Sequence, residues 1–249
     1  MSGHSKWATI KRKKAAADAK RGQVFTKVIK ELIVAAKEGG GDPASNARLR
    51  TAVEKAKSVN MPADNIKKAI QKGTGELPGV TYEEVVYEGY GPGGTAMLIN
   101  VTTDNKNRTV ANIRSQLSKY GGSMASVNAT AWQFEQKGCI SVPPEAGDEE
   151  TIMNIAIEAG AQDIKTEEDS YEIITMPGDF ETVKKALDGK NVKYTNAEVT
   201  MIPKSYVKLE GKDAEKMLKL MGALDEDDDV QNVYANFDMP PDVMEKLSG

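Results

Sequence analysis

The chain is poor in the residues that build most catalytic and metal centres. It has one cysteine, Cys139, and one histidine, His4, among 249 residues. A single cysteine excludes an intramolecular disulfide framework and a cysteine-cluster metal site, and we expect Cys139 to be a buried apolar residue. A lone histidine near a basic N-terminus argues against a histidine-dependent triad. Asp and Glu are plentiful, but no spacing selects a catalytic pair. We therefore expect a non-enzyme without catalytic residues, metal or cofactor.

Long apolar runs and phosphate-binding loops are also missing. No segment reaches the ~20 apolar residues of a membrane span, and the N-terminus lacks the apolar core of a secretory signal. Gly89 to Gly94 fits GxGxxG, but a dinucleotide site needs a helix next, and the residues after Gly94 have the pattern of a strand. We expect a glycine-rich hairpin turn there. These absences predict a cytoplasmic protein with no membrane partner and no small-molecule substrate.

Charge is abundant but unevenly distributed. Residues 1–72 contain 17 Lys and Arg against 6 Asp and Glu, whereas the rest contains 16 against 31. The formal net charge of the whole chain is −4. A basic end on an acidic body is typical of a protein that presents one end to a polyanion.

The basic end has the periodicity of helices. Apolar residues from Val24 to Ala36 recur every three or four positions, which predicts one apolar helix face that ends at Gly39. We expect Asp42 to cap a second helix with Pro43 in its first turn. Pro62 is expected to open a third helix. Three short amphipathic helices should pack into a small bundle.

The period changes after a Gly- and Pro-containing linker at residues 73–79. Residues 84–90 and 95–103 alternate as strands, and a helix follows them. Residues 213–224 and 230–237 supply a further helix and strand near the C-terminus. Because the first ββα piece lacks a closing helix and strand, we expect 230–237 to pair with a strand from 84–103.

Between these pieces lies a separate pattern. Residues 138–202 follow the order β-α-β-β-α-β of a ferredoxin-like sandwich. The chain is thus predicted to be α+β: an N-terminal three-helix bundle followed by two α/β sandwich domains, the third ferredoxin-like and inserted into the second. The expected boundaries are 1–76 for the basic arm and bundle, 77–132 plus 205–249 for the discontinuous domain, and 133–204 for the insert.

Two features outside the basic end have structural interpretations. The acidic run 225–229 lacks the glycine and glutamate spacing of a calcium loop, and we expect a solvated turn after a helix that keeps nucleic acid away. Trp132 and Phe134 fall at the border of the insert, where we expect core or interdomain packing.

Lysine and arginine in the basic end point to nucleic acid, because they neutralise phosphates without reading sequence. The candidate nucleic-acid-binding residues are Lys6, Trp7, Lys11, Arg12, Lys13, Lys14, Lys20, Arg21, Lys27, Lys30, Arg48, Arg50 and Lys55. Lys37, Lys57, Lys67, Lys68 and Lys72 extend the basic surface. Trp7 could equally stack on a base or anchor the arm to the bundle. The excess of lysine over arginine indicates weak base readout.

Several stretches resemble one known family. GHSKWA at 3–8, KAAADAKRG at 14–22, FTK at 25–27 and AAKEGGGDP at 35–43 resemble the YebC/PmpR family, which includes the mitochondrial translational activator of cytochrome oxidase. YEGYGPGG at 87–94, residues 104–109 and VQNVYANF at 230–237 continue the match. The resemblance covers essentially the full chain and implies a three-domain α/β cytoplasmic regulator without catalytic residues.

The resemblance leaves two functions open. One is a DNA-binding transcriptional regulator acting at promoters. The other is a ribosome-associated translation factor that contacts ribosomal RNA and relieves stalling. A lysine-rich end suits either kind of phosphate backbone, so the target remains DNA or ribosomal RNA.

Overall fold

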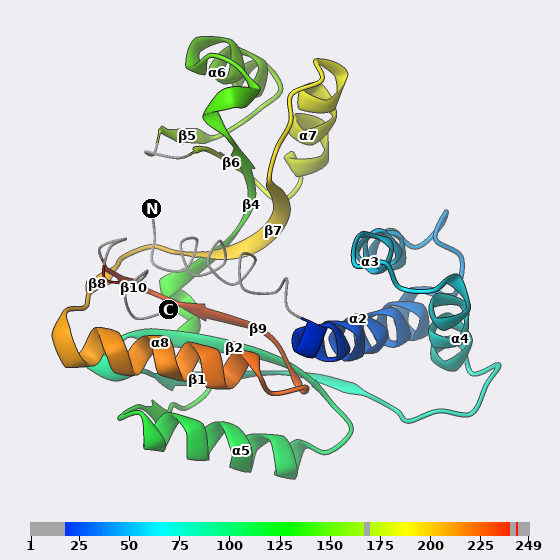
Figure 1. Ribbon diagram of the computed structural model, residues 1–249, viewed down its shortest axis with the longest axis vertical. Helices are drawn as coiled ribbons and strands as arrows, with labels where there is room; N and C mark the ends of the chain where they lie inside the picture. The colour runs from blue at the N-terminus through cyan, green and yellow to red at the C-terminus, as the bar shows by residue number, and fades with distance from the viewer. Residues whose placement is uncertain (1–17, 167–169, 240–242, 244–249) are drawn as a thin grey trace. The chain divides into compact units, whose positions relative to one another are not determined.

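The computed structural model describes residues 18–166, 170–239 and Val243. It is an α+β protein with a helical N-terminal region followed by antiparallel sheets (Figure 1), as the sequence predicts. Contacts group the chain into two compact units, one formed by residues 132–205 and the other by the chain on both sides of that segment. None of the helices in the described ranges is long and apolar enough to cross a membrane.

The N-terminal region consists of three helices around one apolar core. They are α2 (Asp18–Gly39), α3 (Ala47–Ser58) and α4 (Ala63–Thr74). Leu32 of α2 and Leu49 of α3 are fully buried in this core, and Ile66 of α4 packs against them. A Cβ at Gly73 would stand 2.4 Å from the carbonyl oxygen of Ile33, so a glycine here lets α4 approach α2 closely.

The start of α3 differs from the sequence prediction. Asn46, and not Asp42, caps the helix, with its side-chain oxygen accepting from the backbone N–H of Leu49. The Asn46 amide also donates to the carbonyl of Ala35 at 2.7 Å, which fixes α3 against α2. Asp42 instead accepts from the backbone N–H of Ala44 in the preceding turn. The Asp-Pro pair therefore starts a turn, and the helix begins four residues later than expected.

A four-stranded antiparallel sheet follows the bundle. Its strands are β1 (Glu83–Tyr90), β2 (Ala96–Thr103), β3 (Ser123–Met124) and β9 (Val230–Ala235). Along the chain, helix α5 (Lys106–Lys119) precedes β3 and helix α8 (Gly211–Asp225) precedes β9. The strand order is β3-β1-β2-β9, and β9 pairs with β2 through Ile99 and Val233. The expected long-range pairing of the C-terminal strand is therefore confirmed. Helices α5 and α8 share the apolar core on one face of this sheet.

Turns and short strands complete the sheet. The glycine-rich segment forms a short 3-10 turn, η1 (Pro92–Gly94), that joins β1 to β2, with positive φ at Gly93 and Gly94. The predicted C-terminal strand is interrupted at Asn236, whose side-chain oxygen accepts from the backbone N–H of Ala96. Beyond it, β10 (Phe237–Asp238) pairs in parallel with β8 (Val207–Lys208).

The segment 132–205 is ferredoxin-like, as predicted. It contains β4 (Phe134–Val142), α6 (Glu149–Glu158), β5 (Asp163–Thr166), β6 (Tyr171–Thr175), α7 (Phe180–Gly189) and β7 (Asn196–Pro203). The short 3-10 turns η2 (Ala131–Gln133) and η3 (Pro144–Ala146) precede and follow β4. The strand order β5-β6-β4-β7 is that of the split βαβ fold. Cys139 and Phe134 are buried, whereas Trp132 is 67% exposed, so core packing of Trp132 was a wrong expectation.

The domain boundaries remain a prediction. The compact unit at 132–205 lies close to the expected insert, 133–204. The helical bundle and the sheet of β3-β1-β2-β9 fall together in the other unit, although their apolar cores are separate clusters.

Candidate nucleic-acid interface

Six solvent-facing cations of the bundle lie on α3 and α4. They are exposed and belong to two helices whose inner faces are buried in the bundle core: Arg50, Lys55, Lys57, Lys67, Lys68 and Lys72. We call this set the α3–α4 basic face. No ion pair joins any of the six to a carboxylate in the ranges that the structure describes.

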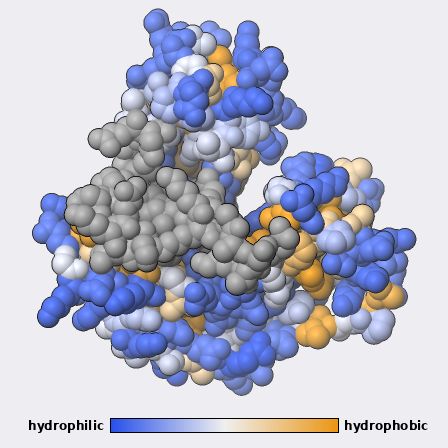
Figure 2. Space-filling model, viewed as in Figure 1, coloured by the Kyte–Doolittle hydropathy of each residue, from blue (hydrophilic) through white to orange (hydrophobic). Residues whose placement is uncertain are grey.

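Local sequence explains why these cations point outward. Buried positions Leu49, Ala52 and Ala56 follow the three-to-four spacing of one face of α3, which leaves Lys55 and Lys57 off that face. Lys55 and Lys57 also lie in the last turn of α3, where the helix dipole favours positive charge. In Figure 2, hydrophilic residues cover much of the visible surface over α3 and α4.

The cations of α2 are used differently. Lys30 is only 5% exposed, and its ammonium group lies 2.6 Å from Oδ1 of Asp229 on the turn before β9. The same nitrogen donates to the carbonyl of Asp228 at 2.8 Å and lies 5.4 Å from the centre of the Tyr82 ring. Lys27 donates to the carbonyl of Asp225 at 2.7 Å. Contrary to expectation, Lys30 is an internal residue in this structure.

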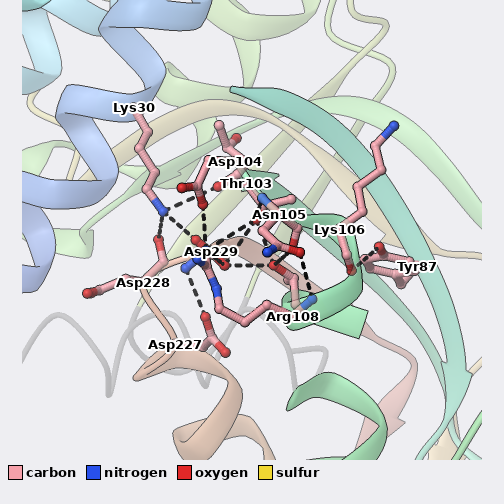
Figure 3. Close-up of polar contacts among 12 residues, drawn as sticks. Lys30, Tyr87, Thr103, Asp104, Asn105, Lys106, Arg108, Asp227, Asp228 and Asp229 are labelled. Carbon is pink, nitrogen blue, oxygen red and sulfur yellow. Dashed lines mark hydrogen bonds and ion pairs between the residues drawn. The ribbon is translucent and has the colours of Figure 1, made fainter. Parts of the chain in front are cut away.

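Asp229 is the centre of a buried polar network (Figure 3). Its Oδ2 accepts from Arg108 and from the hydroxyl of Thr109, both at 2.7 Å, and from Thr103 at 3.1 Å. Burial raises the pKa of Asp229, but the hydrogen bonds from Arg108, Lys30 and Thr109 outweigh it and hold the pKa well below its ordinary value. The carboxylate therefore stays charged at neutral pH.

This network corrects the interpretation of the acidic run. Asp228 is exposed, as expected for a solvated turn, but Asp229 is 5% exposed and binds two cations. Its partners are distant in sequence, up to 199 residues away in the case of Lys30. No local spacing could have identified it; the only sequence signal is its position directly before an apolar strand.

Arg48 is likewise committed to internal contacts. Its guanidinium donates to Glu31 at 2.8 Å, to Glu38 at 2.7 Å and to Glu84 at 2.6 Å. The hydrogen bonds to Glu84 and Glu31 raise the pKa of Arg48 further above its ordinary value. Three carboxylates around one guanidinium make Arg48 a link between α2, α3 and β1.

An open cleft of about 460 Å³ lies beside the network. Its lining combines two cations with several acids and neutral groups: Thr26, Lys30, Tyr82, Asp104, Arg108, Asn112, Glu226, Asp227, Asp228 and Asp229. Because Lys30 and Arg108 already pair with Asp229, the cleft would present carboxylates to a phosphate and repel it. Among the described residues, no group of three His, Cys, Asp or Glu is arranged to hold a metal ion.

A second buried carboxylate, Glu88 on β1, is bound by backbone N–H groups and by no cation among the residues that the structure describes. Its oxygens accept from the backbone N–H groups of Asn128, Thr130 and Ala131 at 2.5, 2.6 and 2.9 Å. Burial raises the pKa of Glu88, but these hydrogen bonds outweigh it and the pKa is lowered overall. Glu88 thus fixes the loop that leads from β3 to the inserted domain.

The remaining predicted residues are only partly placed. Lys6, Trp7, Lys11, Arg12, Lys13 and Lys14 lie outside the described residues. Lys20 and Arg21 belong to the first turn of α2, and their side chains are not among those described. Of the predicted residues whose side chains the structure describes, Arg50 and Lys55 are exposed, and Lys27, Lys30 and Arg48 make the internal contacts given above.

Comparison with known proteins covers nearly the whole chain. Residues 5–76 match the TACO1/YebC protein N-terminal domain, and residues 82–237 match the TACO1/YebC second and third domain. A "Probable transcriptional regulatory protein" of Pelotomaculum thermopropionicum is 57% identical over 96% of this chain and 99% of its own length. One of Citrifermentans bemidjiense with the same name is 57% identical over 99% of this chain and 100% of its own length.

A solved structure shares the architecture. The crystal structure of the conserved hypothetical protein Aq1575 from Aquifex aeolicus is 46% identical, with a TM-score of 0.80 over 90% of this chain and 92% of that one. The family models, the full-length relatives and this structure agree with the resemblance noted in the sequence. The chain belongs to the TACO1/YebC family.

Proposed function

We propose that this protein is a non-enzymatic, DNA-binding regulator of transcription that contacts the phosphate backbone through its basic end. The observation that carries the proposal is the α3–α4 basic face, six exposed cations without carboxylate partners among the described residues. The names of the relatives support a role in regulating transcription.

The chemistry of the face favours backbone contact over base reading. Five of its six cations are lysines, which bind phosphate as point charges, and arginine is the better reader of guanine. Affinity should therefore fall steeply with salt and vary little with sequence. While the turn before β9 is bonded to α2, the acidic cleft beside α2 would repel phosphate, which would direct a polyanion toward the outer helices.

The second candidate function is a ribosome-associated translation factor that contacts ribosomal RNA. The same lysine-rich face supports it, because point charges fit an RNA backbone as well as a DNA backbone. In this case the partner is the ribosome, and the other domains would reach protein or transfer RNA.

Sucrose-gradient sedimentation of a cell lysate separates the two candidates. The lysate is split, and one half is treated with a nuclease that removes DNA. Migration with nucleoid DNA that is lost after this treatment is the expected result for a DNA-binding regulator. Migration with ribosomes that survives the treatment would overturn the transcriptional proposal in favour of the translational one.

The basic arm has its own test in the full-length chain. Replacing Lys11, Arg12, Lys13 and Lys14 with alanine should weaken binding about equally for all sequences. It should also reduce the log–log salt slope by about 0.9 for each phosphate that the arm no longer neutralises. An unchanged slope would show that the arm does not contact phosphate.

A further inference from the structure

The turn between α8 and β9 contacts one side of α2 through a row of polar bonds. Gln23 donates to the carbonyl of Glu226 at 2.9 Å, Lys27 to that of Asp225 at 2.7 Å and Lys30 to that of Asp228 at 2.8 Å. Residues 23, 27 and 30 are spaced by four and three positions, so they share one face of α2. α2 therefore supplies donors to the carbonyls of Asp225 and Glu226 at the C-terminal end of α8, which lack partners within their own helix. It also supplies one to the carbonyl of Asp228 in the turn beyond.

The end of α8 needs these donors for electrostatic reasons. Its last turn contains no basic residue, and Asp225 and Glu226 place negative charge at the negative end of the helix dipole. Asp229 adds a buried carboxylate that holds Lys30. To the lysines of α2, this turn offers closely spaced anionic and carbonyl oxygens, as a nucleic-acid backbone would.

The contact is polar and separate from both apolar cores. The residues that make it, on α2 and on the turn, belong to neither the bundle core nor the core under the sheet. An open cleft lies alongside the contact, lined by Thr26, Asp228 and others, while Lys30 and Asp229 themselves are each 5% exposed. An incoming anion replaces polar contacts of this kind more readily than it separates packed apolar surfaces.

We propose that the α8–β9 turn is an autoinhibitory latch: it occupies Lys27 and Lys30, and nucleic-acid phosphates displace it when they bind α2. This inference rests on the proposed function and adds a closed and an open state to it. Ligand binding shifts such an equilibrium toward the open state in proportion to its preference for that state. Lys27 and Lys30 then contact phosphate only in the open state.

The first test weakens the latch and compares it with a matched charge control. Asp229→Asn removes the carboxylate that holds Lys30, whereas Asp228→Asn removes the same charge from an exposed side chain of the same turn and leaves the Lys30–Asp229 pair intact. Binding of the full chain to a random-sequence DNA duplex and to a ribosomal RNA fragment is measured for wild type and both variants, after circular dichroism has verified folding.

Asp229→Asn should bind about tenfold more tightly than wild type, equivalent to about 1.4 kcal/mol, whereas Asp228→Asn should gain about twofold or less. Equal affinities of the two folded variants would overturn the latch while leaving the proposed function intact. If wild type and both variants bind neither nucleic acid, the proposed function fails and the latch fails with it.

A second measurement needs no substitution. Hydrogen exchange of the wild-type chain with and without the duplex reports on the Thr102 amide, which donates to the carbonyl of Asp229 at 2.8 Å, and on the Val230 amide, which donates to Asp227. Displacement of the turn should speed exchange at both amides. Unchanged or slower exchange in the bound chain would contradict the latch even if Asp229→Asn did not fold.

Discussion

Two sets of cations occupy one small helical bundle and have opposite environments. Lys30 pairs with the carboxylate of Asp229 and Arg48 with the carboxylates of three glutamates, whereas the α3–α4 basic face pairs with none among the described residues. The number of cations in a segment therefore does not measure how many can bind a phosphate. The useful quantity is the charge that remains after internal pairs are formed.

The largest expected effect comes from the exposed set. Replacing Lys55, Lys57, Lys67 and Lys68 with glutamine should lower affinity for a DNA duplex about a hundredfold or more near 100 mM salt and reduce the salt slope by roughly 3 to 4. Stability should change little, because these side chains are exposed. Salt titrations of binding and urea unfolding measure the two quantities.

The control for this variant removes four exposed lysines elsewhere: Lys185, Lys190, Lys193 and Lys212. It changes the net charge equally, so only a general charge effect should remain, about a few-fold in affinity. If both variants lose the same affinity, the location of the cations does not matter and the comparison between the two sets fails.

The internally paired cations Lys30 and Arg48 should, unlike the exposed ones, have a large effect on stability. Lys30→Met leaves Asp229 buried with one cation fewer and should lower the free energy of unfolding by about 3 kcal/mol. Chemical denaturation measures this loss, and Lys37→Met, an exposed lysine on the same helix, is the control, expected to lose about 0.5 kcal/mol or less. A small loss for Lys30→Met would mean that the buried pair contributes little.

Glu88 tests whether backbone N–H donors alone can stabilise a buried carboxylate without a cation. Its three backbone donors should make Glu88→Gln cost about 2 kcal/mol, because an amide offers one acceptor oxygen and its NH₂ group faces N–H donors. Thermal unfolding of Glu88→Gln and of the exposed control Glu54→Gln gives the difference. Equal melting temperatures would contradict this assignment of the Glu88 bonds.

Low pH should lower the free energy of unfolding mainly by protonating the buried carboxylates. The pKa values of Asp229 and Glu88 are lower in the folded chain than their ordinary values near 4, so the unfolded chain binds more protons between the folded and ordinary values. Their contribution to stability is complete above about pH 5 and is lost as the pH falls below about 4. Unfolding free energies measured from pH 7 to pH 3 should decline less in Asp229→Asn than in wild type, and parallel curves would contradict this.

Much of the fold follows from local sequence. Alternation in residues 95–103 and the three-to-four spacing from Val24 to Ala36 specify a strand and a helix without tertiary information. The order of the elements in the insert was enough to predict its sheet. The N-cap of α3 was missed because Asp42 and Asn46 are both good capping residues, and only the contact of Asn46 with Ala35 selects between them.

The candidate site was harder to predict because the ion-pair partner of a cation can lie far away in the sequence. The exposed cations Arg50 and Lys55 were identified from sequence and are available to a ligand. Lys30 has the same side chain and helical spacing, but Asp229, 199 residues away in the chain, decides its role. Such pairs are visible only once β9 is placed beside β2.

The most direct test of nucleic-acid binding is the salt dependence of binding by the unmodified full-length chain. Equilibrium constants for a random-sequence duplex and for a ribosomal RNA fragment are measured between about 50 and 200 mM salt. Phosphate contact predicts a straight log–log line of negative slope, with a magnitude of several units, for at least one of them. A flat line, or no binding to either at the lowest salt, would contradict the account.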